Sequence, residues 1–282
     1  MAITTLDTLL TASKQKVRWK KPSATCVAGQ WHTTFNLLGD PSIGSFSWIN
    51  NQPNGSINGC VIDDSRSGFP SIIPFGTNNK GYLTGFSLSN TLAGRFMIYD
   101  RVWEAGQFFI NNASSGKMYN LITDASTYEY RVPLTSTGKR DWSQLEMWMD
   151  VSSLFPIMTI NIALNYINQD GNASTTPTSP TLSAYITGRN YQFNLQPGDK
   201  GVQRITDISI GSNIDASYGS FQVYLARSLY TNTRININSI NYDSFIPLSM
   251  AQIDASAAIA LNFAADSVAT GVLDCILEIK NG

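Results

Sequence analysis

Charged residues are scarce in this sequence. Only 14% of its 282 residues are Asp, Glu, Lys or Arg, against about a quarter in ordinary soluble domains. The formal net charge of −1 excludes the strong basic excess of an electrostatic nucleic-acid binder. Because interface cores are depleted in charge, this composition favours a protein that packs against copies of itself or a partner. Neutral secreted lectins share the trait.

Histidine and cysteine are also rare. His32 is the only histidine, which disfavours a zinc cage, and its context GQWHTTF follows no nucleophile-elbow pattern. The three cysteines, Cys26, Cys60 and Cys275, are odd in number and have no CxxC spacing. They indicate buried free thiols made in a reducing cytoplasm. The sequence predicts no metal, no cofactor and no enzymatic activity.

Long hydrophobic runs are missing as well. No run reaches the roughly 18 apolar residues of a membrane-spanning helix, so we expect no membrane partner. The first 21 residues lack the apolar core and cleavage site of a signal peptide. The segment NNASSGK has Asn111 where a phosphate-binding loop needs its first glycine.

Alternation of apolar and polar residues is what the sequence has instead. In IMTINIALNYINQD, residues 157–170, Ile162, Leu164 and Tyr166 share one parity, while Asn161 and Asn165 share the other. This period of two predicts an antiparallel strand with one dry and one wet face. Similar runs separated by turns fill the second half of the chain, with QPGDKG at 196–201 as a strong turn signal. The segment 250–266, rich in alanine, fits either helix or strand.

The predicted fold class is therefore mostly β, an antiparallel β-sandwich of jelly-roll character with a short N-terminal helical arm. We expect a basic helical arm over 1–22, a loop-rich β region over 23–135 and an antiparallel β-sandwich over 136–282. Pro70 and Pro74 bar a central strand in the loop-rich region.

The N-terminal arm is the candidate interface. Leu6, Leu9 and Leu10 form an apolar stripe that Pro22 ends. The arm is interpreted as a solvated surface helix with cations at its C-terminal end, or as a docking peptide in which an apolar anchor is ringed by charge. Nucleic-acid contact is disfavoured because the patch is too short. The candidate interface residues are Lys14, Lys16, Arg18, Trp19, Lys20 and Lys21.

Two pairs of carboxylates keep a hydrolase open as a rival. Asp63 and Asp64 are neighbours, and Glu146 and Asp150 share a face of one predicted strand. Four strand residues separate the latter backbones by roughly 13 Å, whereas glycosidase carboxyl groups lie about 5 to 9.5 Å apart. Solvated charges on a wet strand face are the favoured interpretation.

Several segments resemble a family of virion structural proteins from the head-gene regions of tailed double-stranded DNA bacteriophages. The most specific are Gly81-Tyr82-Leu83, Tyr99-Asp100-Arg101, NQDG at 168–171 and GVQRI at 201–205. The resemblance covers residues 27–282 and brings no catalytic residues. The stretch from Lys14 to Lys21 departs from the family pattern.

The resemblance implies a non-enzymatic capsid cement or decoration protein, synthesised in the host bacterial cytoplasm and bound to the capsid exterior. Its implied partners are the major capsid protein and copies of itself, as a homo-oligomer (dimer or trimer), with no membrane and no specific nucleic acid. Asn and Thr on wet faces suit this role because they hydrogen-bond across interfaces without the desolvation cost of buried ions. A tail, fibre or carbohydrate-binding host-adhesion component is the alternative.

Overall fold

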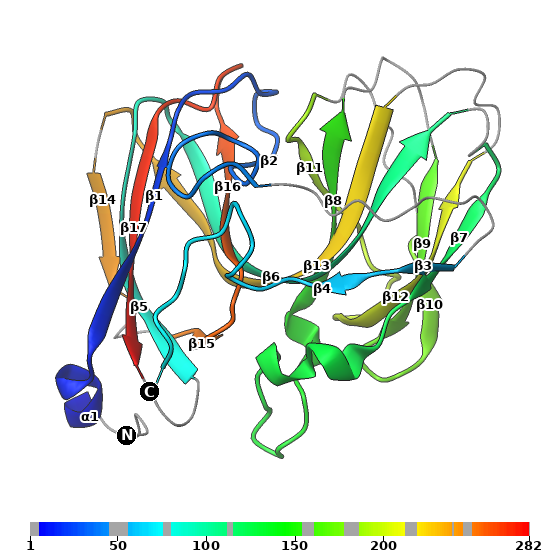
Figure 1. Ribbon diagram of the computed structural model, residues 1–282, viewed down its shortest axis with the longest axis horizontal. Coiled ribbons are helices and arrows are strands. Elements are labelled where there is room, and N and C mark those ends of the chain that lie inside the picture. Colours follow the sequence, from blue (N-terminus) through cyan, green and yellow to red (C-terminus); the bar gives the residue numbers. More distant parts are fainter. Residues whose placement is uncertain are drawn as a thin grey trace. The chain divides into compact units, whose positions relative to one another are not determined.

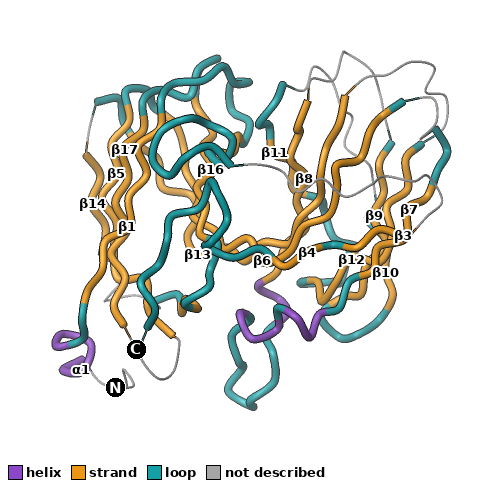
Figure 2. The backbone as a smooth tube through the Cα atoms, in the orientation of Figure 1, coloured by secondary structure: helices purple, strands orange, loops and turns teal. Residues whose placement is uncertain are grey.

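The computed structural model describes residues 6–44, 56–75, 80–111, 115–153, 161–177, 186–211, 219–238, 240–244 and 250–281. These residues are mostly in strands, as Figure 2 shows. The sheets are largely antiparallel, with β3 and β7 forming a parallel pair, so the predicted fold class is confirmed. The elements in chain order are α1 (Leu6–Thr11), β1 (Lys14–Lys21), β2 (His32–Thr33), β3 (Ser56–Asn58), β4 (Cys60–Val61), β5 (Lys80–Asn90), β6 (Gly94–Ile110), β7 (Met118–Ile122), η2 (Ala125–Thr127), η3 (Glu129–Arg131), η4 (Trp142–Gln144), β8 (Leu145–Ser153), β9 (Ile162–Asn168), β10 (Ala173–Thr175), β11 (Asn190–Gln192), β12 (Val202–Ile210), β13 (Gly219–Ile235), β14 (Ile240–Ser244), β15 (Gln252–Asp254), β16 (Ile259–Ala265) and β17 (Leu273–Asn281) (Figure 1).

The chain forms two compact units that interleave along the sequence. Unit 1 consists of residues 1–45, 63–100 and 229–282, and unit 2 of residues 46–62 and 101–228. The predicted boundary at residue 135 lies inside unit 2, and the predicted arm belongs to unit 1. The units do not follow the chain order because each of the long strands β6 and β13 supplies residues to both of them.

Unit 1 contains a five-stranded sheet in the order β1-β17-β5-β14, with β15 also paired to β5. Strand β17 alternates in burial along its length, with Leu273, Cys275, Leu277 and Ile279 on the buried face. These side chains pack with Trp19 in one hydrophobic core. Strands β1 and β17, which lie near opposite ends of the sequence, therefore pair with each other in this unit.

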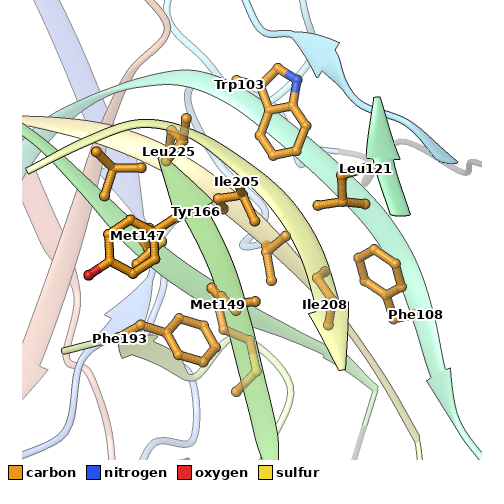
Figure 3. Packing of buried hydrophobic residues seen from close by; sticks show 14 of the residues in the cluster. Trp103, Phe108, Leu121, Met147, Met149, Tyr166, Phe193, Ile205, Ile208 and Leu225 are labelled. Atoms are coloured by element: carbon orange, nitrogen blue, oxygen red, sulfur yellow. The ribbon is translucent and has the colours of Figure 1, made fainter. Parts of the chain in front are cut away.

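Unit 2 contains a second five-stranded sheet in the order β10-β9-β12-β7-β3. Strand β9 confirms the predicted alternation, because Ile162, Leu164 and Tyr166 are buried and the intervening residues are not. Its buried face joins a core that includes Trp103 and Met149 (Figure 3). The turn predicted at 196–201 is present, with the Asp199 amide donating to the Gln196 carbonyl.

The structure corrects the prediction for the N-terminal segment and decides between the two alternatives for the alanine-rich segment 250–266. The helix ends at Thr11, and Lys14–Lys21 is the strand β1, so the helical arm over 1–22 is corrected. The alanine-rich segment, left open between helix and strand, holds the strands β15 and β16. Within the described parts of the chain, no helix is long and apolar enough to cross a membrane.

Candidate interaction surface

The candidate interface residues lie on β1, and their side chains alternate between two faces. Lys14, Lys16, Arg18 and Lys20 are exposed, whereas Gln15, Val17, Trp19 and Lys21 are buried. Trp19 is only 1% exposed and packs in the core of its own unit. The prediction that Trp19 is an exposed docking anchor is therefore wrong, because KVRWK has the period of a strand and places the indole inward.

The exposed cations of β1 are largely paired with the neighbouring strand β17. Glu278 lies 2.5 Å from Lys14 and 4.0 Å from Lys16. Arg18 donates from Nε and Nη2 to the two carboxylate oxygens of Asp274, at 3.1 and 2.6 Å, and this pairing raises the pKa of the guanidinium. A basic patch in the sequence thus becomes a mixed-charge ladder in the fold.

Strand register defines what we call the outer face, the side of the unit 1 sheet opposite its core. One row across it runs Arg18, Ile276, Ser87 and Tyr242, and the next runs Lys20, Asp274, Ser89 and Ile240. Residues directly opposite on adjacent strands project to the same side. The outer face therefore passes from paired charges on β1, through small hydroxyl residues on β5, to apolar side chains on β14.

Strand β14 is the feature of the outer face that the sequence analysis missed. It stands at the end of the sheet order, and Ile240 and Tyr242 are 75% and 66% exposed. Exposed apolar edge strands are sites where another chain can add. The signal in the sequence is the short apolar–polar alternation of Ile240, Asn241 and Tyr242.

A groove of about 540 Å³ opens beside β1, and it is lined by Lys20, Lys21, Pro22, Leu38, Gly39, Asp40 and Val272. Lys21 is not free to meet a partner, because its ammonium donates to the carbonyls of Leu37 at 3.0 Å and Pro41 at 2.6 Å. Burial lowers the pKa of Lys21 to about 8, against the opposing charge of Asp40. Leu38 and Val272 give the groove exposed apolar edges.

The carboxylates considered for hydrolysis serve structural contacts. Asp63 accepts from the Ser65 amide at 3.0 Å, and Asp64 accepts from the Ile72 amide at 2.8 Å. Burial raises the pKa of Glu146, whose carboxylate accepts from the Trp148 indole at 2.9 Å. Glu146 and Asp150 do share a face of β8, as expected, but Asp150 is wholly buried.

Asp150 belongs to a buried cluster that the sequence analysis did not foresee. Arg101 lies between two carboxylates, 2.5 Å from Asp150 and 2.9 Å from Glu104, and all three side chains are fully buried. The guanidinium also stacks on the Tyr224 ring, 3.9 Å from its centroid. The signal in the sequence is the set of three charges, Asp100, Arg101 and Glu104, inside the apolar run IYDRVWEAG.

The scarce chemical residues have structural partners. His32 Nε2 accepts from the Val27 amide at 2.9 Å. All three cysteines are free, with Cys26 and Cys275 buried and Cys60 half-buried. Over the described ranges, no three His, Cys, Asp or Glu side chains come together as a metal-binding group.

Comparison with known proteins identifies no family. No family model matches the chain, and no curated protein matches it. Solved structures with weak similarity include Pseudomonas aeruginosa AlgX, at 13% identity over 51% of this chain and 27% of that one, with a TM-score of 0.23. This chain thus spans about a quarter of AlgX.

Viral proteins are also among the weakly similar structures. Infectious bursal disease virus, Gx strain, aligns at 10% identity over 96% of this chain and 79% of that one, with a TM-score of 0.21. The cyanophage Pam1 capsid aligns at 17% identity over 49% of this chain and 87% of that one, with a TM-score of 0.17. Similarities at these TM-scores do not establish a shared fold and carry no argument about function.

Proposed function

We propose that the protein is a structural component of a tailed-bacteriophage virion, and that it acts as a cement protein on the capsid exterior. The observation that carries the proposal is the outer face of unit 1, which ends in the exposed apolar side chains of Ile240 and Tyr242. The sequence resemblance to virion proteins supports the same role. The partners in this proposal are the major capsid protein and further copies of the chain.

The physical case rests on what the outer face can bind. Lys14 and Arg18 on β1 are paired within the protein, which reduces the number of unpaired ions that docking would bury. Ser87 and Ser89 supply hydroxyl groups at the centre of the face, and Ile240 and Tyr242 supply apolar area at its edge. Aromatic and aliphatic anchors beside polar groups are the composition of a protein–protein interface core.

The experiment is reconstitution on particles. Virions lacking the protein are incubated with purified wild-type chain, and bound copies are counted by quantitative mass spectrometry. The edge variant, Ile240→Lys with Tyr242→Lys, is expected to lose binding by about tenfold or more, since it places two charges in the interface.

The matched control is Met118→Lys with Ile122→Lys, which changes two exposed apolar residues of β7 in unit 2. This variant should bind as wild type. Equal binding by the edge variant would contradict the assignment of the outer face. Binding of a few copies at the tail in place of many on the shell would move the function to host attachment.

A further inference from the structure

Strands β11, β8 and β13 are neighbours in one sheet, and their residues in unit 2 include a row of hydrogen-bond acceptors that lack donors. Strand register places Asn190 of β11, Asp150 of β8 and Gln222 of β13 directly opposite one another. All three side chains are buried. Asn190 Oδ1, Asp150 Oδ1 and Gln222 Oε1 have no hydrogen-bond partner. Three adjacent buried acceptors without a donor are costly, because each loses its hydration without compensation.

The contacts of Asp150 and Glu104 show which carboxyl group needs a donor. Glu104 Oε2 forms an ion pair with Arg101 Nη2 at 2.9 Å and accepts a hydrogen bond from Gln222 Nε2 at 3.3 Å. Asp150 uses only Oδ2 for Arg101, at 2.5 Å, and its Oδ1 is the orphaned atom. One guanidinium therefore faces two buried carboxyl groups, so this trio carries one negative charge in excess if both are ionised.

We propose that Asp150 holds a proton on Oδ1 in the folded protein at neutral pH and donates it to the amide oxygen of Asn190 or Gln222. The proton comes from solvent during folding and leaves Asp150 neutral. It makes Asp150 Oδ1 a donor to one of the two amide oxygens and removes the excess negative charge beside Arg101. Oδ2 stays free to accept from the guanidinium, so no contact in the cluster is lost.

The groups around Asp150 support this assignment. The pKa of Asp150 is raised, and burial is the largest influence on it; the charge of Glu104 also raises this pKa, whereas the charge of Arg101 and hydrogen bonds from Arg101 and Gln222 lower it. The Tyr224 ring stacks on Arg101, and the Tyr224 hydroxyl accepts a hydrogen bond from Asn190 Nδ2 at 2.9 Å. The other charged and titratable groups on the neighbouring strands and their immediate flanks are Arg95, Tyr99, Asp100, Arg101 and Glu104 of β6, Glu146 of β8, Arg189 and Tyr191 at β11, and Tyr224, Arg227, Tyr230 and Arg234 of β13.

The sign of the pH effect follows from linkage. Above pH 4 the unfolded state has an ionised Asp150, whereas the folded state retains the proton, so folding binds one proton. The stability contributed by this group is therefore full at low pH and falls as pH rises toward the folded pKa. In that window the unfolding equilibrium constant increases about tenfold per pH unit from this group alone.

The test compares wild type with Asp150→Asn and Glu104→Gln by urea unfolding at pH 5, 6 and 7. Asparagine reproduces the shape and the donor of a neutral Asp150. Asp150→Asn should therefore lack the pH dependence, and the ratio of wild-type to variant unfolding constants should rise about tenfold per pH unit. Glu104→Gln removes the ionised partner of Arg101 and should raise the unfolding constant more than about 100-fold.

A second readout does not depend on stability. The infrared difference spectrum of wild type minus Asp150→Asn at pH 7 should contain the carbonyl stretch of an un-ionised carboxylic acid. The proposal is overturned by a spectrum with only carboxylate bands. A ratio of unfolding constants that is independent of pH between 5 and 7 would overturn it equally, since Asp150 would then be ionised in both states.

Discussion

Replacing Trp19 with alanine removes the largest side chain that β1 contributes to the core of unit 1. The indole is 1% exposed and packs with Val17 and Leu277, among others. A buried tryptophan covers roughly 200 Å², worth about 5 kcal/mol at 25 cal/mol per Å², and measured truncations of this kind cost about 3–5 kcal/mol. We expect Trp19→Ala to lower the free energy of unfolding by about 3–5 kcal/mol.

The assay is urea unfolding followed by far-ultraviolet circular dichroism, with Lys16→Ala as the control on the same strand. Lys16 is exposed, and its only approach to Glu278 is a distant one at 4.0 Å, so its change should stay within about 0.5 kcal/mol. A Trp19→Ala protein as stable as the control would refute the placement of β1 in the core. Residues 14–21 would then be a separable arm, and their truncation would leave unit 1 folded.

Three further predictions follow from individual contacts. The pKa of Lys21 is about 8 in the folded protein, below its usual value of 10.5, so the unfolded state binds one more proton between these two pH values and the free energy of unfolding rises with pH. Lys21→Met should abolish this rise in urea unfolding measured from pH 8 to 10.5. A variant whose free energy of unfolding rises with pH as steeply as that of wild type would contradict the prediction. Asp199→Asn should lower the free energy of unfolding by about 0.5–1.5 kcal/mol, since the carboxylate accepts from Tyr166 at 2.7 Å and Asn168 at 2.7 Å. These contacts lower the pKa of Asp199, so the stability they give wild type is lost as pH falls below 3.8. A variant whose free energy of unfolding falls with acid as steeply as that of wild type would contradict this. Ile240→Lys should lower self-association, measured by sedimentation, because a charge protects an exposed edge strand; an unchanged oligomer excludes β14 from the contact.

Local patterns in the sequence predicted the features that depend on local physics. The alternation around Leu164 gives a strand with one buried face, because side chains point to opposite sides in turn. Pro197 and Gly198 are typical turn residues and predict the turn that begins at Gln196. In the structure Gly198 has a positive φ of 101°, which glycine adopts without strain. The mostly β antiparallel class follows from such signals repeated along the chain.

Long-range partners decide the parts that the sequence analysis missed. Nothing local tells that Trp19 will face Cys275, more than 250 residues away, so the cationic stretch was interpreted as the end of a helix. The burial of Arg101 depends on two carboxylate partners, one of which, Asp150, lies on another strand, so no local pattern predicts it. The interleaved units likewise depend on β6 and β13, and local sequence patterns predicted neither the full length of these two strands nor their pairing.

The proposed role as a virion cement protein is tested most directly by the copy number of the chain in purified particles. Quantitative mass spectrometry combined with electron microscopy would give both the number of copies and their location. The proposal predicts copies in large number, spread over the outer shell between capsomers, with the outer face of unit 1 in contact. Absence from the particle, or confinement to a few copies at the tail, would contradict it.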